Sequence, residues 1–152
     1  MKDQEKEISS QLILLQNKVE ELISFFNQHY NYDVRVNAQW SAKDVLGHLT
    51  FWHESFARNL KDLADGIKPN PFKGTLSMVN ERSVRCTREC SIKELQLRLD
   101  QDQKIINENI FNNAIEMIPY KKGSRDYSRL EHLIIVENHI AKHLKELTIK
   151  IG

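Results

Sequence analysis

The chain has 152 residues, a length usual for a single domain, and its 22 basic residues nearly balance its 21 acidic ones. A net charge of +1 produces no strong electrostatic field that would attract a polyanion, so we expect no nucleic-acid partner. Only 5 glycines and 3 prolines are present, which favours long helices over a sheet-rich fold. We therefore expect one all-α domain over residues 1–152.

Apolar residues at steps of three and four predict two long helices in the first half of the chain. The first spans about residues 3–29, and the segment 31–40 then breaks the period. The second follows Ser41, an N-cap residue with Asp44 three positions later as in a capping box, and it continues to about Ala64. Gly66 and the prolines after it end this helix.

The second half of the chain predicts one short and two long helices. The short one covers about residues 75–88, and a capping-box pattern at Ser91 and Glu94 opens the next, which reaches about residue 110. After Pro119 and Gly123 a last helix covers about residues 126–149. Each long helix has one apolar stripe, so four of them form a bundle, either up-and-down or with one longer crossover that carries the short helix.

The remaining bulk features indicate a cytoplasmic protein. The N-terminal segment is charged and lacks the apolar region of a secretory signal, and no apolar run approaches the ~20 residues that cross a bilayer. Cys86 and Cys90 lie four residues apart on an expected helix, a spacing that matches no zinc knuckle and no CxxC motif. We therefore interpret them as reduced thiols and expect no membrane partner.

Histidines form the best candidate site. His139 and His143 are four residues apart on the last expected helix, so both imidazoles lie on one helix face and are close enough to share a metal ion. His132 falls on the same stripe, and His48 has a similar place on the second helix. If these helices are neighbours, His48, His139 and His143 converge as three ligands with an open fourth position, the arrangement of a catalytic site.

The competing interpretation is that these are partly exposed surface histidines. An HxxxH pattern without the glutamate of HExxH is weak support for a metal by itself. Geometry separates the two hypotheses, because ring nitrogens more than ~5 Å apart cannot share one ion.

The string from Trp40 to Glu54, WSAKDVLGHLTFWHE, resembles the second-helix signature of the DinB-like superfamily, and of its ClbS/DfsB family in particular. Weaker similarity follows at four later positions, Pro71, Gly74, Asn80 and Glu81. The resemblance implies a DinB-like four-helix bundle with one extra short helix. It also implies a divalent metal, nickel or zinc, on one histidine of the second helix and two of the last, which by position are His48, His139 and His143.

The resemblance implies more than one kind of activity. Some DinB-like proteins resemble thiol-S-transferases that use a low-molecular-weight thiol such as bacillithiol or mycothiol, and others resemble metal-dependent hydrolases. The ClbS/DfsB family is associated with protection against reactive toxic metabolites, and its members generally lack the complete histidine triad. This chain differs from them, because His143 completes the triad.

Three hypotheses follow. The first is a metal-dependent thiol transferase or hydrolase that acts on a small electrophilic or toxic molecule, with His53 and Glu54 as candidate acid and base near the substrate. The second is a metal-free protective or small-molecule-binding protein of the ClbS/DfsB kind, and the third is a helical interaction module without chemistry. A homodimer is compatible with all three. Tyr120 and Tyr127 are candidates for a pocket mouth, and the basic run 121–125 for contact with an acidic ligand.

Overall fold

A computed structural model describes residues 2–152 and is mostly helical. In chain order the elements are α1 (Lys2–Phe25), α2 (Ala42–Ala64), α3 (Leu76–Thr87), α4 (Ile92–Asn109), β1 (Met117–Ile118), β2 (Tyr127–Ser128) and α5 (Arg129–Ile151). The all-α fold class is confirmed. None of these helices is both long and apolar enough to cross a bilayer.

Local signals explain where the helices begin. Ser41 accepts a hydrogen bond from the Asp44 backbone N–H while the Asp44 carboxylate accepts one from the Ser41 N–H, so the predicted capping box is present. A second capping box, which the sequence analysis overlooked, joins Ser128 and Glu131 and starts α5 three residues later than expected. α1 ends at Phe25, four residues before the predicted limit.

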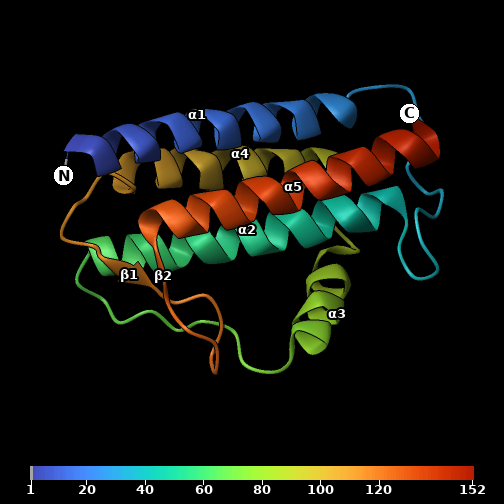
Figure 1. Cartoon of the computed structure of the whole chain (residues 1–152). Coiled ribbons are helices and arrows are strands. Elements are labelled where there is room, and N and C mark those ends of the chain that lie inside the picture. The colour runs from blue at the N-terminus through green and yellow to red at the C-terminus, as the bar shows by residue number, and fades with distance from the viewer. Residues whose placement is uncertain (1) are drawn as a thin grey trace.

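The four long helices form a bundle in which spatial neighbours are not always chain neighbours (Figure 1). α1 and α5 lie side by side and run in the same direction, as do α2 and α4, while the two pairs run in opposite directions. The arrangement is therefore the crossover variant: the connection between α2 and α4 carries α3 and returns the chain to the end where α2 began. The fold is a four-helix bundle with one extra short helix in the long connection, as predicted.

The core is made by the apolar stripes of all four long helices. Fully buried members include Leu15 of α1, Leu46 of α2, Leu99 of α4 and Leu133 of α5. Burial of such stripes is the main force that holds the helices together, because no amphipathic helix can cover its own stripe.

Two smaller features shape the region beside α2 and α5. The short antiparallel pair β1–β2, with Met117 opposite Ser128, lies at one end of α2, where the prediction had only a loop. α3 packs chiefly on α2, toward the other end. A Cβ atom at Gly47 would lie 2.1 Å from Thr87 Oγ1, so glycine is what allows α2 and α3 to approach so closely.

Candidate metal centre

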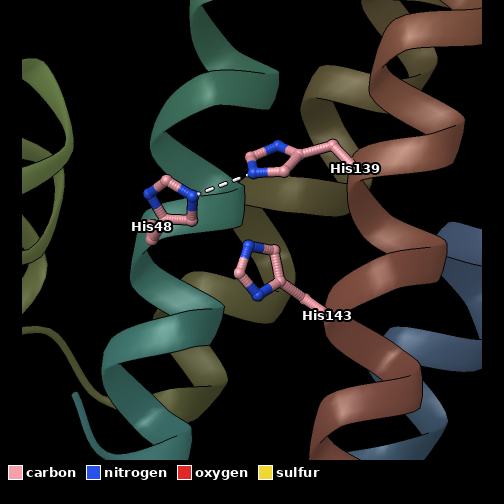
Figure 2. Close-up of side chains that lie close together, drawn as sticks. All are labelled: His48, His139 and His143. Atoms are coloured by element: carbon pink, nitrogen blue, oxygen red, sulfur yellow. Dashed lines mark hydrogen bonds between the residues drawn. The ribbon is translucent and has the colours of Figure 1, made fainter. Parts of the chain in front are cut away.

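Three of the six histidines come together between α2 and α5 (Figure 2). His48 extends from α2, and His139 and His143 extend from successive turns of α5 toward it. One ring nitrogen from each histidine lies within 4.8 Å of those of the other two. The predicted three-histidine cluster is therefore present, and its nitrogens are within the ~5 Å limit set above.

Hydrogen bonds fix the orientation of His48. Ser83 of α3 donates its hydroxyl proton to the Asn80 carbonyl oxygen at 2.5 Å, so Ser83 Oγ acts as acceptor for the Nδ1–H of His48 at 3.0 Å. This leaves His48 Nε2 unprotonated, 3.0 Å from His139 Nε2. The Trp40 ring packs on the His48 ring, with centroids 4.7 Å apart. A metal-binding histidine commonly has its second nitrogen held in this way.

His143 has a comparable partner, because its Nδ1 lies 3.4 Å from a carboxylate oxygen of Glu146. The pair comes from the same helix and is partly exposed at Glu146. It leaves Nε2 of His143 available on the opposite side of the ring.

Burial keeps all three rings neutral. It lowers the pKa of His48 to about 2, with a further contribution from the nearby His139 and His143, and it lowers the pKa of His139 to about 4. The pKa of His143 is lowered for the same reason. At neutral pH the cluster therefore offers lone pairs and no positive charge, which is what a divalent cation requires of imidazole ligands.

The donor set fits a divalent ion of the zinc or nickel kind. Three neutral imidazoles from two helices, with other protein ligands absent among the described residues, match a site that keeps a position open. Bonds of ~2.0–2.1 Å at tetrahedral angles place ligand nitrogens about 3.4 Å apart, so nitrogens that lie within 4.8 Å of one another must close by up to about 1.4 Å to bind one ion.

A cavity of about 350 Å³ leads away from the cluster between α2, α5, the first part of α3 and the residues that follow β1. His139 is part of its wall, so the cavity and the cluster are continuous. Much of the wall is aromatic or aliphatic, including Trp52, Phe56 and Tyr120. Its volume and lining suit a small organic molecule.

His53 and Glu54, the predicted acid and base, lie elsewhere on α2. His53 is buried against α4 and donates from Nε2 to the Gln103 side-chain oxygen at 2.8 Å, and Glu54 pairs with Arg98 of α4. Neither residue lines the cavity beside His139. Their acid–base role stays a prediction, and their contacts are those of residues that join α2 to α4.

The remaining residues singled out in the sequence lie partly at the cavity and partly away from it. His132 shares the α5 face with His139 but packs flat on Phe56, with ring centroids 4.9 Å apart, and bonds to the Ile118 carbonyl instead of joining the cluster. Tyr120 lines the cavity, whereas Tyr127 does not and instead meets the Tyr120 and His132 rings edge to face. In the basic run 121–125, Arg125 pairs with the exposed Glu131.

The residues that sequence reasoning missed are those that support the ligands. Ser83 is fully buried on the apolar face of α3, next in sequence to Val84, and a polar residue in such a stripe was the available signal. Trp40 and Asn80 belong to the positions of the family resemblance, but the sequence does not show that Trp40 packs on His48 or that the Asn80 carbonyl oxygen accepts from Ser83.

Comparison with known proteins gives a fold likeness and nothing closer. No family model matches the chain, and no curated protein matches it. Among solved structures, it resembles a mycothiol-dependent maleylpyruvate isomerase with a TM-score of 0.73 at 9% identity. A histidine-to-alanine mutant of that isomerase gives a TM-score of 0.70 at 8% identity. Both matches cover 92% of this chain but only 60% of the isomerase chain. At such identities the likeness shows the fold, and this chain has the helical fold of that isomerase.

Proposed function

We propose that this chain is a DinB-like metal-dependent enzyme that acts on a small electrophilic molecule with the help of a low-molecular-weight thiol. The observation that carries the proposal is the convergence of three neutral histidines from α2 and α5 at the wall of a cavity of ligand size. Zinc and nickel are the proposed ions, since both accept imidazole ligands.

The chemistry follows from the position of the site. A divalent ion, when bound, lowers the pKa of a thiol that coordinates it, so that the nucleophilic thiolate forms at neutral pH. His48, His139 and His143 hold the ion, and Ser83 keeps His48 in the tautomer whose Nε2 is free to bind. The apolar wall formed by residues such as Trp52 and Phe56 excludes water from the electrophile.

A thiol is favoured over water as the nucleophile by two observations. Two solved structures with the same fold are those of an enzyme named as mycothiol-dependent. The cavity also has room beside His139 for more than water, and Lys142 at its wall offers a positive charge for a carboxylate of a thiol cofactor or substrate. Hydrolysis by an activated water is the second reaction that the same site supports.

A metal-free protective protein of the ClbS/DfsB kind is the alternative. The observation in its favour is that His48 and His139 already lie within hydrogen-bonding distance of each other, 3.0 Å between the two Nε2 atoms. A cluster satisfied in this way needs no ion to be stable. The cavity would then bind a reactive compound without metal chemistry.

Metal analysis of the untagged protein distinguishes the metal-dependent enzyme from the metal-free protective protein. We expect zinc or nickel at close to one ion per chain in the wild type and in His29→Ala, an exposed histidine far from the cluster in sequence. His139→Ala should lose the ion while keeping the helical circular dichroism of the wild type. A wild-type protein that stays metal-free after incubation with both ions would contradict the metal-dependent proposal.

A second measurement identifies the nucleophile. The protein is loaded with cobalt(II), and free cysteine is then added as a simple thiol. If a thiol occupies the open position, a thiolate-to-cobalt charge-transfer absorption appears and is absent in His139→Ala. A cobalt spectrum that does not respond to cysteine would favour the hydrolase.

The proposal also includes a cytoplasmic location and a homodimer. Cys86 and Cys90 are both free thiols, as a reducing cytoplasm would leave them. The homodimer stays a prediction, which light scattering on the purified protein checks.

A further inference from the structure

Asn80 of α3 is part of the cavity wall, and two hydrogen bonds hold it there. Its side-chain Oδ1 accepts from the Trp52 Nε1–H at 2.9 Å, and its backbone carbonyl oxygen accepts from Ser83. An indole N–H can only donate, so the oxygen of the amide must face Trp52. The nitrogen Nδ2, with its two protons, is thereby directed away from Trp52.

These two protons have no acceptor among the described residues. The buried polar atoms without a partner in this part of the chain belong to Asn59, Asp102 and His132. Asn80 Nδ2 is not one of them, so it is accessible. Asn80 and Ser83 are three residues apart on α3 and share the face that meets α2, which directs the Asn80 side chain toward the cavity. The free donor therefore belongs to the cavity wall.

The same contacts place this donor close to the histidine cluster. Ser83 bonds to His48 and Asn80 bonds to Trp52, which follows His48 by four residues on α2. Four residues correspond to about 6 Å along the helix axis, so the Asn80 amide lies about one turn from the cluster. A hydrogen bond of ~2.9 Å and a C=O bond of ~1.2 Å span about 4 Å of that distance.

The charge of the wall indicates what the donor binds. No side chain of the described wall residues carries a carboxylate, and Lys142 is the one charged side chain among them. A ligand with an oxygen acceptor therefore meets no repulsion, whereas a cationic ligand finds no counter-charge. Trp52 stacks on Tyr120 with an angle of 9° between the rings, which gives the rest of the ligand a flat apolar surface.

We propose that Asn80 is a substrate-binding residue, whose Nδ2–H donates to a carbonyl oxygen on a mostly apolar ligand in the cavity. As applied to the reaction, the inference rests on the proposed function and names the class of its electrophile, a carbonyl compound. The binding of the carbonyl oxygen does not itself depend on the metal.

In the reaction, the role of Asn80 is to stabilise charge on that oxygen. When a thiolate adds to the carbonyl carbon, a C–S bond forms and the π-electron pair of the C=O bond moves to the oxygen, which then takes a proton from water. An N–H donor that already points at the oxygen stabilises this charge without rearrangement. Trp52 and Ser83 supply the fixed orientation that such a donor needs.

The test uses two probes of nearly the same shape. Acetophenone has a carbonyl oxygen, and α-methylstyrene has a CH2 group in its place. Both are titrated into the intact protein with a chelator present, so that no metal contributes, and NMR follows the Asn80 side-chain NH2 signals after through-bond assignment. We expect acetophenone to move the proton signals downfield, as a new hydrogen bond requires, and α-methylstyrene to leave them nearly unchanged.

A variant connects the signal to the affinity. Asn80→Asp retains an acceptor for Trp52 and removes the donor. Because the probes differ in their transfer from water, the compared quantity is the ratio of their two dissociation constants. This ratio should shift against acetophenone by about threefold or more in Asn80→Asp. Asn138→Asp introduces the same charge at an exposed position of the same wall and should keep the wild-type ratio.

Three results would overturn the inference: Asn80 signals that do not respond to acetophenone, no binding of acetophenone at millimolar concentration, or an equal shift of the ratio in both variants. The first two are measured on the wild type, so they hold even if Asn80→Asp fails to fold. All three are independent of the metal analysis. A carbonyl preference in a protein that never binds zinc or nickel would support this binding site and remove the metal-dependent enzyme.

Discussion

His53 offers the sharpest test of how buried titratable groups act in this bundle. Its side chain is buried between α2 and α4 and donates to Gln103, whose own amide donates to Asn107 and is thereby fixed. Replacement by glutamine, His53→Gln, keeps a donor for Gln103 and removes the titration. A comparison of the two proteins across pH therefore isolates the protonation of one ring.

The magnitude follows from the pKa. Burial lowers the pKa of His53 from 6.5 to about 4, so between these values the unfolded chain binds a proton that the folded chain does not. The stabilisation is complete above pH 6.5 and is lost as the pH falls toward 4. A difference of about 2.5 pKa units corresponds to about 3 kcal/mol in the free energy of unfolding.

Urea denaturation at a series of pH values from 7 to about 4 measures how the free energy of unfolding depends on pH. The wild type should lose about 3 kcal/mol more than His53→Gln over the range. The control His29→Gln should follow the wild type, because that side chain is exposed. Parallel curves for the wild type and His53→Gln would refute the burial argument and would make an accessible acid–base role for His53 more credible.

Three further perturbations test other parts of the structure. Gly47→Ala places a Cβ 2.1 Å from Thr87 Oγ1 and should destabilise the protein by about 1–3 kcal/mol. The melting temperature should recover in the double variant Gly47→Ala/Thr87→Gly. An unchanged melting temperature in the single variant would contradict the tight contact between α2 and α3. Ser83→Ala should weaken zinc binding about tenfold or more in a competition titration, and full retained affinity would show that its bond to the metal ligand is dispensable. Burial, with a smaller contribution from a neighbouring carboxylate, raises the pKa of Asp102 to about 8, so stability should fall as the pH rises from about 4 to 8 and fall less in Asp102→Asn. Asp100→Asn, on the exposed side of α4, should behave as the wild type in the same denaturation series.

The sequence predicted the helices well because their determinants are local. Periodic stripes and capping residues such as Ser41 act within a few positions, and the same physics operates in the folded protein. The end of α1 and the start of α5 were less accurate, since end positions depend on competing turns and caps. The order in which helices pack was left open, and the parallel pairing of α2 with α4 comes from the crossover through α3.

The candidate site could be predicted from the sequence to about the same extent as the helices. His139 and His143 share a face by spacing alone, and the addition of His48 required only that α2 and α5 be neighbours. His53 and Glu54 could not be placed in this way, because a one-residue step along a helix rotates a side chain by about 100° and sends it to another neighbour. The buried side chains of Asn59 and His132 bond to the carbonyl oxygens of Pro119 and Ile118, at a two-residue strand that periodicity cannot reveal.

The placement of α3 has a consequence for the timing of events at the histidines. α3 packs chiefly on α2, so its separation from the bundle exposes less surface than global unfolding and should occur more often. Each such opening removes Ser83 from His48 and lets that imidazole exchange its proton between the two ring nitrogens. Amide hydrogen exchange in α3 would then report how often Nε2 of His48 can take up this proton and leave the tautomer that binds an ion, so the local opening of a peripheral helix sets how long this ligand stays ready for an ion.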